Sequence, residues 1–196
     1  MTNCGCHSTA TNSAERKILI IALILNVTMF VVGLIAGILA QSTSLIADSL
    51  DMLADAAAYT IGLFTIGRSL RFKAIAATLS GMLLLILGIG VLFEVVRRAW
   101  MGSFPESTTI IIVACASLVV NANVLRLLGR FRQGEVHLRA TWIFTRADVI
   151  VNLGVIVSGV LVALTKSRYP DLIVGFFVGL YVIREAYEIL MDAQNT

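Results

Sequence analysis

Six long apolar stretches, separated by short polar breaks, constrain this chain more than any other feature of its sequence. Each stretch is long enough for the ~20 apolar residues that an α-helix needs to cross a bilayer. Because the breaks are short, successive helices should be antiparallel neighbours. We therefore expect an all-α integral membrane protein with six transmembrane helices. The expected helices cover about Arg16–Ala40, Ser44–Gly67, Lys73–Val96, Thr108–Leu128, Ala140–Thr165 and Asp171–Met191.

The composition agrees with a membrane environment. Hydrophobic residues make up 58% of the chain and charged residues 14%, whereas roughly a quarter of the residues of a soluble domain are charged. The mean hydropathy is +0.92. The cations lie between the apolar stretches and form no basic stripe interleaved with aromatic residues. We therefore expect membrane lipid as a partner and no nucleic acid.

The distribution of Lys and Arg predicts the orientation, because cytoplasmic loops are enriched in both. One side carries Arg16, Lys17, Arg68, Arg71, Lys73, Arg126, Arg130, Arg132, Arg139 and Arg184. The other side carries Arg97, Arg98, Lys166 and Arg168. Both termini are therefore expected in the cytoplasm. We divide the chain into an N-terminal cytoplasmic tail over residues 1–15, a six-helix domain over 16–192 and a short tail over 193–196.

Two smaller features concern helix packing. Gly33 and Gly37 form a pair of small residues four positions apart, which predicts that another helix approaches closely at this face. Cys115 stands alone in an apolar stretch, and we expect it to be a small buried packing residue.

The second apolar stretch carries Asp48, Asp51 and Asp55. Their spacings of three and four residues place them on one face of a helix. An aspartate near the bilayer centre costs ~2.5–3.5 kcal/mol on insertion scales, so three on one face indicate a functional site. A divalent cation bound among them would relieve their mutual repulsion.

A fourth aspartate, Asp148, lies in the fifth stretch. At a rise of ~1.5 Å per residue, Asp55 lies roughly 16 Å from the outer end of its helix and Asp148 about 12 Å from the inner end of its own. Both levels are near the midplane of a hydrocarbon core ~30 Å thick. The sequence therefore predicts a cation site made by carboxylates of two helices.

Other roles remain open for several of these residues. Asp48 is either a metal ligand or a hydrated group at the mouth of a cavity. Asp51 and Asp55 are either metal ligands or structural hydrogen-bond acceptors. Asp148 either binds the ion or pairs with Arg146 or the backbone. Asn152 either supports the ligands or forms a hydrogen bond between helices.

The sequence from Ser42 to Asp55 resembles the signature of the cation diffusion facilitator family of metal/proton antiporters. In that family the second helix carries His or Asp, followed four residues later by Asp, as a pair of metal ligands, and Asp51 and Asp55 match this pair. The fifth helix normally contributes His, followed four residues later by Asp, and Asp148 matches that Asp. The resemblance covers nearly the whole chain from Glu15 onward.

The resemblance implies a secondary transporter, not an enzyme. It would export a divalent metal ion such as Zn²⁺, Co²⁺ or Cd²⁺ in exchange for protons, with the metal as substrate and no prosthetic group. Asp51, Asp55 and Asp148 would bind the ion when deprotonated and release it when protonated. Family members are typically homodimers, and the implied location is a cell membrane, in this case a bacterial inner membrane.

The chain departs from the family pattern at two points. Phe144 occupies the position of the fifth-helix His and cannot bind a metal, so water, Asp48, Asn152 or nothing would fill the fourth ligand position. An all-oxygen set favours harder ions than the usual Zn²⁺ site. The sequence also ends shortly after the sixth helix, so we expect a form without the family's cytoplasmic C-terminal domain.

The N-terminal tail contains Cys4, Cys6 and His7 within four residues. Two thiols and an imidazole either capture a soft ion such as Zn²⁺, Hg²⁺ or Pb²⁺ near the cytoplasmic mouth or belong to an inert tail.

Two other functions are compatible with intramembrane aspartates. An intramembrane aspartyl protease would require a Gly-x-Gly-Asp segment, whereas Arg146 and Ala147 precede Asp148. A transport-deficient or regulatory membrane partner with the same fold is the remaining alternative, since Phe144 has replaced a ligand.

Overall fold

The computed structural model describes residues 6–64, 70–128 and 136–194, and all regular structure in these ranges is α-helical. The six helices are α1 (Cys6–Leu39), α2 (Thr43–Phe64), α3 (Leu70–Met101), α4 (Ser107–Leu128), α5 (Val136–Thr165) and α6 (Tyr169–Gln194). Each expected helix is present. The largest difference is at the beginning of α1, which includes polar residues that we assigned to the tail. No proline interrupts residues 6–16, so nothing prevents the helix from starting early.

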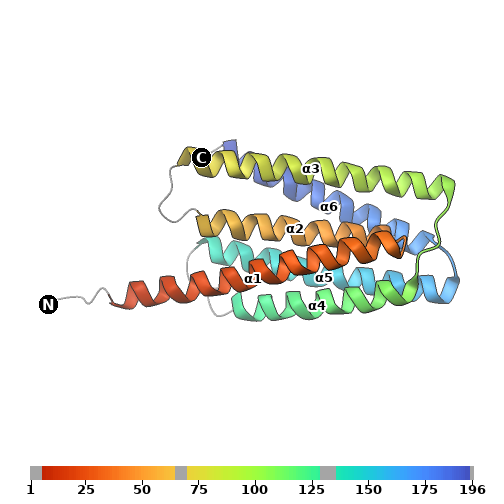
Figure 1. The fold of residues 1–196 in the computed structure, drawn as a ribbon, viewed down its shortest axis with the longest axis horizontal. Helices are drawn as coiled ribbons and strands as arrows, with labels where there is room; N and C mark the ends of the chain where they lie inside the picture. Colours follow the sequence, from red (N-terminus) through yellow and green to blue (C-terminus); the bar gives the residue numbers. More distant parts are fainter. Residues whose placement is uncertain (1–5, 65–69, 129–135, 195–196) are drawn as a thin grey trace.

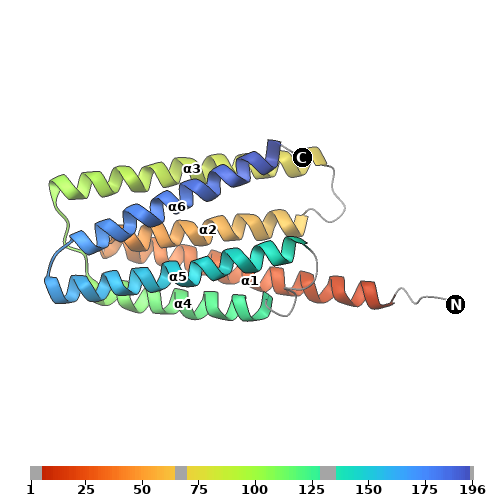
Figure 2. The same cartoon turned by 180° about the vertical axis from the view of Figure 1, so that it is seen from behind.

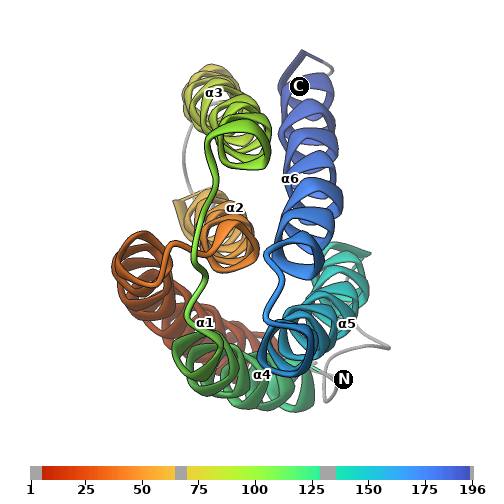
Figure 3. The same ribbon diagram turned by 90° about the vertical axis from the view of Figure 1, so that its right-hand side faces the viewer.

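The helices lie side by side along the long axis of the molecule, and each runs antiparallel to the next (Figure 1). The beginning of α1 and the end of α6 lie at the same end of the bundle, as the view from behind also shows (Figure 2). Seen end on, α2 lies between α1 on one side and α3 and α6 on the other (Figure 3). It contacts all five other helices. Residues on the inner faces of α2 are therefore surrounded by protein.

The surface of the bundle is apolar. Large hydrophobic side chains are exposed along the outer faces of the helices, among them Ile24, Ile86, Phe93, Val157 and Leu164. Within the described residues, four helices are long and apolar enough to cross a membrane: α1, α3, α4 and α5. The other two, α2 and α6, carry most of the buried acidic residues of the described part, and Asp148 lies on α5. An apolar exterior around helices with acidic interior faces suits a bilayer, not water.

Small residues bring α1 against α2. A Cβ added at Gly37 would lie 2.9 Å from the backbone nitrogen of Ile46, and one at Gly33 would lie 3.2 Å from Cβ of Ser49. This confirms that the glycine pair permits close helix packing. The expectation for Cys115 is wrong: it is exposed on α4. An apolar residue in a membrane helix can face lipid as well as a core, so its type alone does not determine its burial.

Asp171, in the first turn of α6, binds the beginning of α2. Its carboxylate accepts hydrogen bonds from the hydroxyls of Ser42 (2.6 Å), Thr43 (2.8 Å) and Ser44 (2.6 Å). It also accepts bonds from the backbone N–H of Thr43 (2.7 Å) and of Ser44 (3.2 Å). Gly175, one turn further, leaves no room for a Cβ beside Thr43. Together these contacts fix how α6 is aligned along α2.

Substituting Gly37 by Ala should destabilise the bundle by about 1–3 kcal/mol, because the added methyl overlaps the α2 backbone, which cannot move aside as a side chain can. Gly90→Ala is the matched control, since a Cβ there meets nothing within 4 Å. The midpoints of thermal unfolding in detergent measure the difference. Equal midpoints for the two variants would contradict the packing described here.

Candidate metal centre

Three aspartates of α2 lie on the face that the helix turns towards α5 and α6. Asp48, Asp51 and Asp55 are all buried. The helix begins with a run of hydroxyl residues bound by Asp171, which places the three aspartates one, two and three turns further along. The stripe expected from the sequence spacing is therefore present, and it faces protein.

Side chains from three helices converge beside this stripe. Asp51 of α2, Asp148 of α5 and Glu185 of α6 each contribute one carboxylate oxygen to a group in which these atoms lie within 4.8 Å of one another. The exposed fractions of the three residues are 3%, 1% and 9%. Oxygens this close can bind one cation in common, because ligands about 2.0–2.6 Å from an ion lie roughly 3–4.5 Å from one another.

Asp55 lies directly beside this group. Its carboxylate is close enough to that of Asp148 to form a hydrogen bond when one of the two carries a proton, and it also interacts electrostatically with Glu185. It is not one of the three residues whose oxygens lie within 4.8 Å of one another. The structure thus brings four carboxylates together, from three helices.

Several oxygens of this group lack a hydrogen-bond donor. Both carboxylate oxygens of Asp148 and Oδ1 of Asp51 are buried without a partner. Within the described ranges, the ion pairs are those of Glu94 with Arg97 and Arg98, and of Arg184 with Glu188, so none involves these aspartates. Buried acceptors without donors are costly unless protons or a cation satisfy them.

Asp48 belongs to a different polar group, nearer the beginning of α2. Asn152 donates a hydrogen bond from Nδ2 to Oδ1 of Asp48 (2.6 Å) and accepts one from Nδ2 of Asn121 (3.1 Å). Ser117 of α4 also hydrogen-bonds to Asp48. All four side chains are buried. Asp48 and Asn152 therefore link α2, α4 and α5 through hydrogen bonds, and Asp48 is outside the three-carboxylate group.

The pairs between α2 and α5 follow an antiparallel order. Asp48 meets Asn152, and Asp55 meets Asp148 one to two turns away. Another turn along, the hydroxyl of Tyr59 lies 3.3 Å from that of Thr145. The carboxylates are therefore flanked on both sides by polar contacts between the same two helices.

Glu185 was not expected from the sequence. It stands beside Arg184 near the end of the sixth apolar stretch, where charged residues are usual, and its neighbour Arg184 pairs with Glu188 at the surface. The spacing of the acidic residues in this stretch nevertheless indicated that Glu185 is on a buried face. Glu185 follows Asp171 by fourteen residues, which is close to four helical turns, so both share one face of α6.

Four residues named in the sequence analysis belong to the N-terminal tail and to the fifth apolar stretch. Cys4, and the side chains of Cys6, His7 and Phe144, lie outside the described part of the structure. The metal-binding role suggested for the N-terminal residues, and the consequence of Phe144 for the site, remain predictions.

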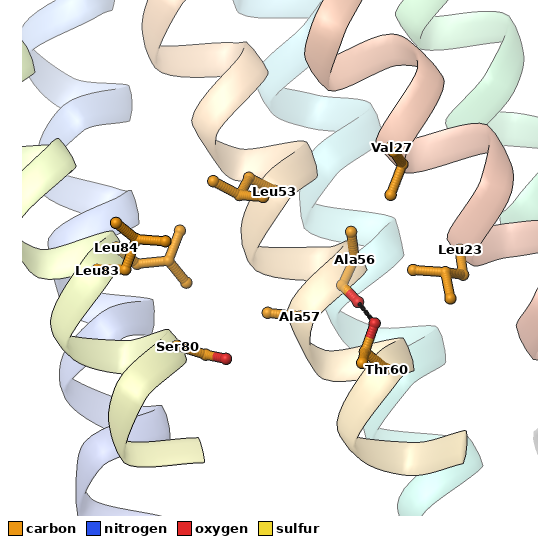
Figure 4. A pocket seen from close by; sticks show the side chains of 9 residues that line it. All are labelled: Leu23, Val27, Leu53, Ala56, Ala57, Thr60, Ser80, Leu83 and Leu84. Atoms are coloured by element: carbon orange, nitrogen blue, oxygen red, sulfur yellow. Dashed lines mark hydrogen bonds between the residues drawn. The ribbon is translucent and has the colours of Figure 1, made fainter. Parts of the chain in front are cut away.

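A surface hollow of about 230 Å³ lies between α1, α2 and α3 and is distinct from the carboxylate group (Figure 4). Its lining includes Leu23, Leu53 and Leu84, and its polar groups are the hydroxyls of Thr60 and Ser80. Thr60 donates its hydroxyl to the carbonyl of Ala56, within its own helix. With no charged side chain in its lining, this hollow offers nothing to a metal ion.

The sequence matches the cation efflux transmembrane domain over residues 19–195. This chain belongs to the cation efflux family. It is accordingly a multi-pass membrane protein, in agreement with its apolar exterior and the four long apolar helices in its described part.

Curated relatives of this cation efflux protein include a cadmium, cobalt and zinc/H(+)-K(+) antiporter of Bacillus subtilis, 22% identical over 92% of this chain and 62% of that protein. The zinc transporter ZitB of Escherichia coli is 25% identical over 96% of this chain and 64% of that protein. The proton-coupled zinc antiporter SLC30A2 of the mouse is 24% identical over 96% of this chain and 58% of that protein. The chain thus spans less than two thirds of the length of these relatives.

Replacing Asn152 by Ala should destabilise the protein by about 1–3 kcal/mol, because Asp48 and Asn121 would both lose a buried hydrogen bond. Asn123→Ala serves as the control: Asn123 is exposed on α4 and bonds only within its own helix. Thermal unfolding of both variants in detergent tests this. An Asn152→Ala protein as stable as the control would show that this link contributes nothing to stability.

Proposed function

We propose that this cation efflux protein is a secondary transporter that exports a divalent metal ion from the cytoplasm in exchange for protons. The observation that carries the proposal is the group of buried carboxylate oxygens without donors on Asp51 and Asp148, with Asp55 beside it. Buried acceptors of this kind need a positive partner, and a transported cation supplies one. The printed names of the relatives support cadmium, cobalt or zinc as candidate substrates.

Charge balance explains the coupling. Without a metal ion, several carboxylates within a few ångströms of one another repel, and protons must neutralise them. When a divalent ion enters, the ligands lose those protons, because only the deprotonated form binds. Metal binding and proton binding therefore exclude one another at Asp51, Asp55 and Asp148, and this exclusion couples the two fluxes.

The location of the ligands on different helices makes alternating access possible. Asp51 and Asp55 are on α2, whereas Asp148 is on α5. Tilting of these helices relative to each other would open the site first to one side and then to the other. In this proposal all six helices span the membrane and both termini are cytoplasmic, supported by the antiparallel order of the helices and the excess of Lys and Arg at that end.

Three further features belong to the same proposal. The protein functions in a bacterial inner membrane as a homodimer, as the family resemblance implies. Cys4, Cys6 and His7 capture metal ions at the cytoplasmic entrance. The metal is a substrate, and no prosthetic group takes part.

Asp55→Ala and Asp148→Ala should each abolish metal-dependent proton flux, because each removes a carboxylate from the group that exchanges metal for protons. Proteoliposomes containing a pH-sensitive dye provide the measurement, with Cd²⁺, Co²⁺ and Zn²⁺ as test ions. Glu188→Ala is the control. It removes a carboxylate of α6 that pairs with Arg184 at the surface, and this variant should retain flux. Wild-type flux in either aspartate variant would contradict the site, and a folded wild type without flux would favour a regulatory membrane partner.

Phe144→His should shift ion preference towards Zn²⁺, because an imidazole at this point restores the ligand that the family normally has there. The ranking of Zn²⁺ against Co²⁺ and Cd²⁺ in the same flux assay tests the change. Phe144→Leu controls for the loss of the aromatic ring alone. An unchanged ranking in the His variant would mean that this position does not face the ion.

A further inference from the structure

We propose that Glu185 of α6 is a ligand of the transported ion, so that three helices and carboxylate oxygens alone form the site. The inference rests on the proposed metal transport and adds a ligand that the family pattern does not contain. It also identifies the substrate class as divalent ions that accept oxygen ligands, of which Mn²⁺ is the convenient probe.

The position of Glu185 is the first argument. One of its carboxylate oxygens lies within 4.8 Å of oxygens of both Asp51 and Asp148, and those two oxygens lie within the same distance of each other. Its exposed fraction is 9%, although it is in the C-terminal half of α6, where the side chains of Arg184 and Glu188 reach the surface. A carboxylate held on the buried face of a helix needs donors or a cation to compensate it, as hydroxyl groups compensate Asp171.

The surroundings of Glu185 are the second argument. Its interacting neighbours include the hydroxyl of Tyr181, one turn before it, and the carboxyl group of Asp51. Tyr181 can hold one oxygen of Glu185 by a hydrogen bond, which orients the carboxylate. Across from it, Asp148 has two buried oxygens with no donor. Carboxylates that converge on unpartnered oxygens favour binding of a cation, since no ion pair of the described residues compensates them.

Glu185 also compensates for the missing family ligand. Phe144 occupies the position at which the resemblance implies a histidine on the fifth helix. With Glu185, the group has four carboxylates: Asp51, Asp55, Asp148 and Glu185. Such a set lacks nitrogen and sulfur ligands, which favour Zn²⁺ and Cd²⁺ over Mn²⁺. The ratio of Cd²⁺ to Mn²⁺ affinity should therefore be low in the wild type.

Binding measurements on the purified full chain test this. All proteins carry Cys4→Ser and Cys6→Ser, so that the thiols of the tail do not bind Cd²⁺. Free Mn²⁺ is followed by electron paramagnetic resonance, and Cd²⁺ affinity is obtained by competition. Glu185→Gln should weaken Mn²⁺ binding about tenfold or more. Glu188→Gln is the control, because its exposed carboxylate pairs with Arg184, and its affinity should stay within about twofold of the wild type.

A cysteine at the same position tests ligation directly. Glu185→Cys should raise the ratio of Cd²⁺ to Mn²⁺ affinity about tenfold or more, because a thiolate favours the softer ion. If Glu185 had only a structural role, Glu185→Cys would weaken the binding of Cd²⁺ and Mn²⁺ alike, and the ratio of the two affinities would not change. That result would overturn the inference even if Glu185→Gln were unstable. Wild-type Mn²⁺ affinity in Glu185→Gln would overturn it as well.

Asp148→Asn separates this inference from the proposed function. If Asp148→Asn loses binding while both Glu185 variants keep the wild-type affinities and ratio, the metal site stands and Glu185 is not a ligand. If the wild type binds none of Mn²⁺, Co²⁺, Zn²⁺ and Cd²⁺, the proposed function itself is wrong.

Discussion

Enclosing several carboxylates inside an apolar bundle is the physical constraint on which the rest of this structure depends. Each charged group removed from water is expensive, so the chain surrounds its acidic residues with protein and exposes apolar side chains to the outside. Three of them lie on α2, which contacts each of the other five helices. Glycines let α1 approach α2 closely enough to close one side of this enclosure. The cost that remains is compensated only when protons or a cation occupy the group.

Asp171 has a different task from the other buried acidic residues. Its oxygens are satisfied by the hydroxyls and backbone N–H groups at the beginning of α2, so it needs no cation. By joining the first turns of α2 and α6, it fixes their alignment. Glu185 follows on the same face of α6 and thereby reaches the level of Asp51. One buried carboxylate thus acts as a structural anchor that positions another.

The sequence predicts the six helices and the aspartates of the site, but not Glu185. Apolar stretches predict helices because backbone groups in lipid must bond within their own segment. The face shared by Asp48, Asp51 and Asp55 follows from helical periodicity alone, and the meeting with Asp148 follows from the antiparallel order. Glu185 depends on how α6 crosses α2, which periodicity does not encode. Cys115 was misjudged because lipid and core select the same residue types, so apolar character does not distinguish the faces of α4.

The polar contacts between α2 and α5 suggest how the two ends of this helix pair could open alternately. Asn152 bonds to Asp48 on one side of the carboxylates, and Tyr59 lies beside Thr145 on the other. In the proposed alternating access, a tilt that opens one side would break the contact on that side and could leave the other in place. The first contact involves a carboxylate and is 2.6 Å long, whereas the second joins two hydroxyls at 3.3 Å. Because charge-assisted hydrogen bonds are stronger than neutral ones, the Asp48–Asn152 bond costs more to break than the hydroxyl contact on the side of Tyr59. In the proposed orientation that side faces the cytoplasm, where an exporter must collect its ion.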